Sequence, residues 1–193
     1  MAASEDQIAL LGRALDQTGA LIAGIRPEEA GLPTPCRSWD VRALVDHVVD
    51  EVRRFAAVTA GGRRDHQGTD LIGDDRHGAY RAAARELLAA WHGPGARERP
   101  HRLPFGEIPA EWAVGQHITE LVVHAWDIAK ATGRPTDLDP ELGEAALAWG
   151  LANLTPEHRA DEADGGHIGP RVEVPEDAPL YDRLAAFGGR DPR

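Results

Sequence analysis

The sequence predicts an all-α fold in which long helices pack as a bundle. Apolar residues recur at intervals of three and four in several segments, the spacing that puts them on one face of a helix. Capping residues, prolines and glycines bound these segments, as is typical of helix ends. The sequence shows no internal repeat and no convincing strand pattern. At 193 residues the chain suits a single domain, which we expect over residues 1–193.

A proline-rich loop separates the first two predicted helices. Apolar side chains at helical spacing predict the first helix over residues 5–25, and Pro27 ends it. The second helix is expected from about residue 39 to residue 58, where Val41 begins an apolar arc. Ser38 is its candidate N-cap, because a serine hydroxyl can accept a hydrogen bond from the first helical turn.

Polar connections precede the third and fourth predicted helices. Residues 76–91 are rich in alanine and leucine and predict the third helix. Pro109 suits the first turn of a fourth helix that continues to about residue 132, and Gly133 suits its C-cap. The long crossover between the second and fourth helices leaves the order of the bundle open.

The remaining chain predicts a fifth helix, an irregular segment and a short last helix. An Asp-Pro pair opens the fifth helix, expected over residues 140–154. Residues 155–179 are dominated by proline, glycine and acidic residues and are expected to form an irregular loop. A short helix over residues 180–187 is expected to pack back onto the bundle. The glycine pair at 188–189 then predicts release of the tail.

Charge and cysteine content exclude several classes of protein. The formal net charge is -11, from 32 acidic and 21 basic residues, which disfavours binding to nucleic acids and anionic membranes. Cys36 is the only cysteine, so no intramolecular disulfide or cysteine-based zinc framework can form. The sequence has no signal-peptide pattern and no uncharged apolar run near the about 18 residues of a membrane helix. We therefore expect a cytoplasmic protein without nucleic-acid or membrane partners.

A polar stripe interrupts the apolar sequence of the fourth predicted helix. His117, Glu120 and His124 are three and four residues apart, which places them on one helical face. Burying an ionisable group without a partner costs several kcal/mol, so such groups are paired, neutralised or bound to a metal. The stripe therefore predicts a specific partner.

A metal is one such partner. His47 lies beside the apolar arc of the second predicted helix and is placed to face a cavity between helices. With Glu120 and His124 it would supply three nitrogen and oxygen ligands, the set of catalytic zinc sites that keep one position open. Nickel, iron and manganese also accept these ligands. By spacing alone, a hydrogen-bonded Glu120–His124 pair beside an unrelated surface His47 is the alternative.

Three stretches of the chain resemble a known group of proteins. They read PTPCRSWDVRALVDHVV over residues 33–49, ELVVHAWDIAKATG over 120–133 and DRLAAFGGRDP over 182–192. These stretches resemble the DinB-like superfamily. They are most similar to its actinobacterial branch, which carries the metal-binding N-terminal domain of mycothiol-dependent maleylpyruvate isomerase. The resemblance spans nearly the whole chain.

The resemblance implies a fold and a ligand set. The fold would be a DinB-like four-helix bundle with a long crossover connection, here followed by a short C-terminal helix. The family's metal ligands would correspond to His47, Glu120 and His124. His117, one turn before Glu120, would then support a ligand, face the substrate or act as an alternative ligand. Independently of the resemblance, Asp127 continues the polar stripe one turn after His124. Its spacing suits either a hydrogen bond that orients a ligand histidine or an N-cap or surface role.

The resemblance also implies a thiol chemistry. In this family the thiol is mycothiol, and coordination to a divalent metal favours its thiolate form. We hypothesise a metal-dependent mycothiol S-transferase or related enzyme that acts on a small electrophile. A metal-dependent hydrolase and a non-catalytic, stress-related metal- or ligand-binding bundle remain the alternatives. The family's isomerase carries a C-terminal extension that contributes to catalysis, so the resemblance does not imply isomerase activity. A homodimer, the native metal and the substrate are left open.

Overall fold

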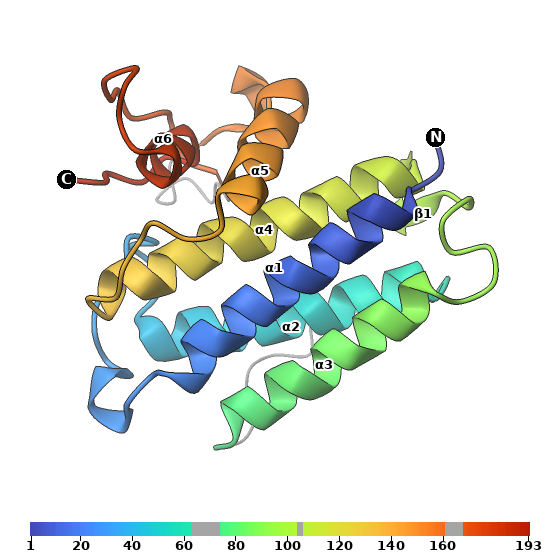
Figure 1. The fold of residues 1–193 in the computed structure, drawn as a ribbon, viewed down its shortest axis with the longest axis horizontal. Helices are drawn as coiled ribbons and strands as arrows, with labels where there is room; N and C mark the ends of the chain where they lie inside the picture. The colour runs from blue at the N-terminus through green and yellow to red at the C-terminus, as the bar shows by residue number, and fades with distance from the viewer. Residues whose placement is uncertain (63–73, 104–105, 161–167) are drawn as a thin grey trace.

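Figure 1 shows the fold of the protein. The structure is a computed structural model, and it describes residues 1–62, 74–103, 106–160 and 168–193. Part of the predicted irregular segment therefore lies outside the described residues. The four longest helices are neighbours, because α1 packs on α3 and α4, and α2 packs on the same two helices. Their bounds are α1 Glu5–Ala23, α2 Val41–Thr59, α3 Arg76–Trp91 and α4 Ala110–Ala131. The prediction of an all-α fold is confirmed.

Two shorter helices cover α4 on the side away from α2. They are α5, Pro140–Asn153, and α6, Leu180–Phe187, and they contact both α4 and each other (Figure 1). Single-turn 3-10 helices η1, Pro27–Glu29, and η3, Pro156–His158, lie in the connections. The expected last helix over residues 180–187 is thus present as α6.

Local capping explains where α2 begins. The Asp40 carboxylate accepts a hydrogen bond from the Ala43 backbone N–H at 2.8 Å, so Asp40 is the N-cap and the helix begins at Val41. The prediction of Ser38 as the N-cap is wrong. The chain turns just before the helix, where the Trp39 N–H donates to the Cys36 carbonyl at 2.9 Å. Trp39 therefore lies outside α2, next to its first turn.

The connection between α3 and α4 contains a small antiparallel hairpin. Its strands are β1, His101–Leu103, and β2, Gly106–Ile108, with His101 opposite Ile108. The prediction that the chain has no strand is therefore wrong in this segment. Each strand has three residues, which is too short for the alternation that marks a strand in sequence to become visible.

The core lies between the helices and fixes how α2 and α4 face each other. Each of the four long helices contributes fully buried side chains, among them Leu11, Val49, Leu87 and Val122.

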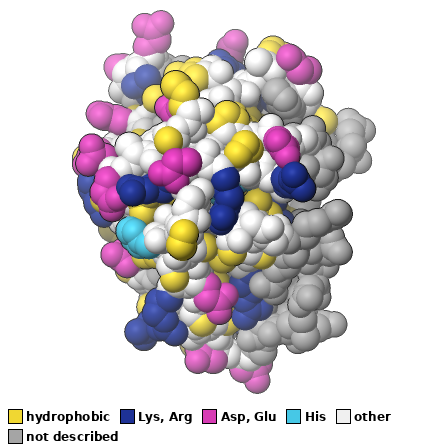
Figure 2. Space-filling model, turned by 90° about the vertical axis from the view of Figure 1, so that its right-hand side faces the viewer, with side chains coloured by type: hydrophobic (Ala, Val, Ile, Leu, Met, Phe, Trp, Pro, Cys, Tyr) yellow, Lys and Arg dark blue, Asp and Glu magenta, His cyan; other side chains and the backbone are white. Residues whose placement is uncertain are grey.

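The surface differs from the core. On the face drawn in Figure 2, acidic, basic and hydrophobic side chains of the described residues are interspersed. No helix in the described ranges is long and apolar enough to cross a bilayer.

Candidate metal centre

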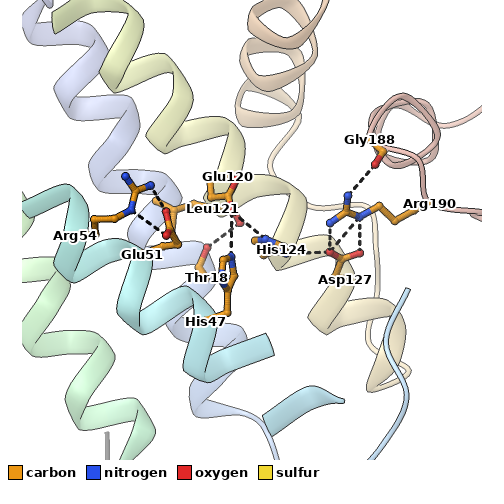
Figure 3. A network of polar contacts seen from close by, with 10 residues as sticks. All are labelled: Thr18, His47, Glu51, Arg54, Glu120, Leu121, His124, Asp127, Gly188 and Arg190. Carbon is orange, nitrogen blue, oxygen red and sulfur yellow. Dashed lines mark hydrogen bonds and ion pairs between the residues drawn. The ribbon is translucent and has the colours of Figure 1, made fainter. Parts of the chain in front are cut away.

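Three metal-competent side chains meet between α2 and α4 (Figure 3). His47 comes from α2, and Glu120 and His124 come from successive turns of α4. The Nε2 atom of His47 lies 3.2 Å from Glu120 Oε1, and the Nε2 atom of His124 lies 3.1 Å from the same oxygen. One ligand atom from each residue lies within 4.8 Å of the other two. The structure thus brings together the three residues that the sequence proposes as ligands.

The spacing of these atoms suits one small divalent ion. Zinc bonds to imidazole nitrogen and carboxylate oxygen are about 2.0–2.1 Å long, so tetrahedral ligand atoms lie about 3.3 Å apart. The two contacts to Glu120 Oε1 are close to that separation. Two imidazoles and one carboxylate also match the donor set of catalytic zinc sites. The residues present therefore fit a metal with at least one further coordination position.

The site is buried on one side and accessible on the other. The His124 side chain is only 5% exposed, whereas His47 is 22% and Glu120 34% exposed. The indole of Trp39 stacks on the imidazole of His47 with centroids 4.2 Å apart. The imidazole of His124 meets that of His47 edge-on at 5.1 Å. The site is therefore in contact with solvent on the side of His47 and Glu120.

A hydrogen bond on its far side orients the buried histidine. The Nδ1 atom of His124 lies 3.0 Å from Oδ2 of Asp127, which is completely buried. When Nδ1 donates its hydrogen to this carboxylate, the Nε2 lone pair of the neutral imidazole points toward Glu120. Asp127 therefore lies where its spacing from His124 predicts a residue that can orient a ligand.

Arg190 completes this network and was not identified from sequence. Its guanidinium donates from Nη2 to Asp127 Oδ2 at 3.1 Å and from Nε to Oδ1 at 3.3 Å. The prediction that the glycine pair at 188–189 releases the tail is wrong, because Arg190 is 8% exposed and the Pro192 carbonyl accepts a bond from Lys130 Nζ. The only sequence signal for Arg190 is its place in the family-like ending over residues 182–192.

His117 is buried one turn away, in other surroundings. Its ring stacks on Phe55 with centroids 3.8 Å apart and meets Trp91 edge-on at 5.8 Å. It is not part of the group of metal-competent side chains found among the described residues. Burial holds the pKa of His117 well below its ordinary value, so the ring is neutral at pH 7. Its predicted support of the site stays a prediction.

Opposite charges inside the site set its protonation. Burial acts to lower the pKa of His124, but the charge of Glu120 and the hydrogen bond to Asp127 outweigh this and raise it to about 9. Burial acts to raise the pKa of Glu120, yet the neighbouring charge of His124 holds it well below its ordinary value. Without a metal, the site is therefore an ion pair between the buried His124 and the partly exposed Glu120, and a metal must displace a proton from His124.

The raised pKa of His124 predicts how stability depends on pH. Its protonated form stabilises the metal-free protein fully below the unfolded value of 6.5, and this contribution disappears as pH rises through about 9. The free energy of unfolding should therefore fall over that range in metal-free protein, but not in metal-loaded protein. Urea unfolding across the range, with His124→Gln as the control that lacks the dependence, checks this. A flat profile for metal-free wild type would contradict it.

Comparisons with known proteins support a family assignment. A model of the mycothiol maleylpyruvate isomerase N-terminal domain family matches residues 11–129, which include all three metal-competent residues and Asp127 but not Arg190. The chain is 38% identical to the uncharacterized proteins Rv0738 and MT0763 from two strains of Mycobacterium tuberculosis. This match runs over 186 residues and covers 94% of the chain and 96% of each relative.

Two solved structures have a similar fold. Both are crystal structures of the mycothiol-dependent maleylpyruvate isomerase, one of them of a mutant. Their TM-scores to this chain are 0.66 and 0.65, with 16% and 17% sequence identity. The similarity covers 86% of this chain and 73% of each isomerase chain. At this level of identity, the likeness concerns the fold.

Proposed function

Because the chain belongs to the mycothiol maleylpyruvate isomerase N-terminal domain family, we propose that it is a divalent-metal protein that acts with mycothiol or a closely related thiol. His47, Glu120 and His124 are the proposed ligands, and zinc is the proposed metal. The observation that carries this proposal is the convergence of both Nε2 atoms on one carboxylate oxygen, 3.2 and 3.1 Å away. The two solved isomerases with a similar fold are mycothiol-dependent, so the proposed partner is a small thiol.

The chain's own residues would hold the metal and leave room for a thiol. His124 is fixed from behind by Asp127, and His47 is stacked on Trp39. Glu120 and His47 are the partly exposed members, so the thiol would approach on their side. A divalent ion bound there would favour the thiolate form of the thiol, which is the nucleophilic form.

The proposed reaction is transfer of the thiol to a small electrophile. With an electron-poor double bond as the acceptor, the sulfur bonds to one carbon and the proton lost by the thiol ends on the other carbon. No oxidant, reductant or further reactant is consumed. The likeness to the solved isomerases, 16–17% identity over 73% of their length, supports a shared fold, and the proposed reaction does not include their isomerase activity.

Titration of mycothiol into zinc-loaded and metal-free protein tests this function. We expect saturable binding by the zinc-loaded form, with loss of binding in the metal-free form and in His47→Ala. S-methylated mycothiol is the matched control ligand, because it retains the sugar and inositol parts but has no thiol proton to lose. Absence of thiol binding by zinc-loaded protein would contradict the proposal. Ester hydrolysis without thiol dependence would instead identify a metal-dependent hydrolase.

A further inference from the structure

We propose that Arg190 is a positioning residue: it holds Asp127 so that the ring of His124 presents Nε2 to Glu120 and to the metal. This inference rests on the proposed function, because it concerns the same site. Figure 3 shows the continuous series of polar contacts on which it depends, from Gly188 through Arg190, Asp127 and His124 to Glu120. Arg190 itself touches neither the proposed ligands nor the open side of the site in any described hydrogen bond.

The guanidinium constrains both oxygens of the Asp127 carboxylate. Nη2 donates to Oδ2 at 3.1 Å, while Nε lies 3.3 Å from each of Oδ1 and Oδ2. An arginine fork of this kind fixes the plane of a carboxylate, which a lysine ammonium does not do. The fixed carboxylate is the acceptor for Nδ1 of His124 at 3.0 Å. Arg190 thus acts on the orientation of the His124 ring through Asp127.

Burial makes the pairing necessary. The Asp127 side chain is 0% exposed and that of Arg190 is 9% exposed. A buried carboxylate without a compensating charge is strongly unfavourable, and removing one partner of a buried pair leaves the other uncompensated. Without Arg190, Asp127 would therefore either take up a proton or turn away. In either case it would lose its role as a fixed acceptor for His124.

The last turn of the chain is built to bring Arg190 to this place. Gly189 has φ of 85°, a left-handed conformation that favours glycine, and a Cβ there would lie 2.7 Å from the Gly169 Cα. This turn directs the chain back from α6, and the Arg190 N–H donates to the Ala185 carbonyl at 2.9 Å. Arg190 Nη1 also donates to the Gly188 carbonyl at 2.8 Å. The guanidinium is therefore held at both ends of its fork.

Zinc affinity of the full chain, measured by competition with a chromophoric chelator, tests the proposal. Arg190→Met should raise the zinc Kd about 10- to 100-fold, the usual effect of removing a partner behind a ligand. Arg190→Lys, which keeps the charge but not the fork, should raise it less. In an Asp127→Asn background, Arg190→Met should add less than about twofold, because the carboxylate that transmits the effect is gone.

Arg134→Met is the matched control. Arg134 follows α4, and its Nη2 forms an ion pair at 3.1 Å with Glu29. Glu29 is buried and lies in the connection between α1 and α2. Its loss should reduce stability in denaturant but leave the zinc Kd within about twofold of wild type. Folded Arg190→Met with the wild-type zinc Kd would overturn the positioning role. If Arg190→Met does not fold, Arg190→Lys decides: a raised Kd supports the role and an unchanged Kd overturns it.

The tautomer of His124 separates this inference from the proposed function. Long-range ¹H–¹⁵N spectra of metal-free protein, recorded above about pH 9 so that the imidazole of His124 is neutral, should show Nδ1–H in wild type and a mixture of tautomers in Arg190→Met. If wild type binds no zinc, the proposed metal function fails, and the spectra alone decide the positioning role. Identical spectra for the two proteins would then overturn it.

Discussion

Glu120→Ala and His124→Ala are each expected to weaken zinc binding by about a hundredfold to a thousandfold. Structural zinc sites bind with about 10–16 kcal/mol, so one ligand among four positions accounts for about 2.5–4 kcal/mol. Glu120→Ala should reduce zinc affinity more than His124→Ala, because Oε1 of Glu120 lies within 3.2 Å of Nε2 of both histidines. Chelator competition and metal content after gel filtration measure the change.

His92→Ala is the control for these variants. His92 is exposed and caps the end of α3, away from the site. The His92→Ala variant should keep the full metal content of wild type. Equal metal content in wild type, Glu120→Ala and His124→Ala would contradict the assigned ligands.

Leu87→Ala is expected to destabilise the protein by about 2–5 kcal/mol while leaving metal binding intact. Leu87 lies on α3 and is 0% exposed, so its truncation leaves a cavity that the neighbouring helices fill only in part. This loss is a large fraction of the total free energy of unfolding of a single domain, which is about 5–15 kcal/mol. Urea unfolding of zinc-loaded protein measures the free energy.

Leu151→Ala is the matched variant for Leu87→Ala. Leu151 is 56% exposed on α5, so its truncation removes the same atoms without forming a buried cavity. Its free energy of unfolding should stay within about 0.5 kcal/mol of wild type. Equal losses in both leucine variants would contradict the described core.

The helices could be predicted because their signals are local. Apolar spacing and composition located α3 at Arg76–Trp91, the same residues that the structure shows. The predicted start of α2 lies two residues before the observed start at Val41, since a serine and an aspartate both suit an N-cap and the fold shows that Asp40 bonds to Ala43. The hairpin of β1 and β2 was missed because its pairing joins two three-residue segments that carry no periodicity.

The candidate site divides in the same way. Glu120 and His124 could be placed together because they are one turn apart on a single helix. Pairing them with His47 rests on its place beside the apolar arc of α2 and on the family resemblance, because His47 and Glu120 are 73 residues apart and no local pattern connects them. Arg190 lies 63 residues from Asp127, and the glycine pair before it resembles a flexible ending in sequence. In the structure, the left-handed turn at Gly189 directs the chain back so that Arg190 reaches Asp127.

A crystal of the zinc-loaded protein, measured at the zinc absorption edge, would show whether His47, Glu120 and His124 bind one metal. We expect one anomalous peak per chain, about 2.0–2.2 Å from Nε2 of His47, Nε2 of His124 and a carboxylate oxygen of Glu120. A fully occupied zinc bound elsewhere, or zinc-saturated crystals with the three side chains still hydrogen-bonded and no peak between them, would contradict it.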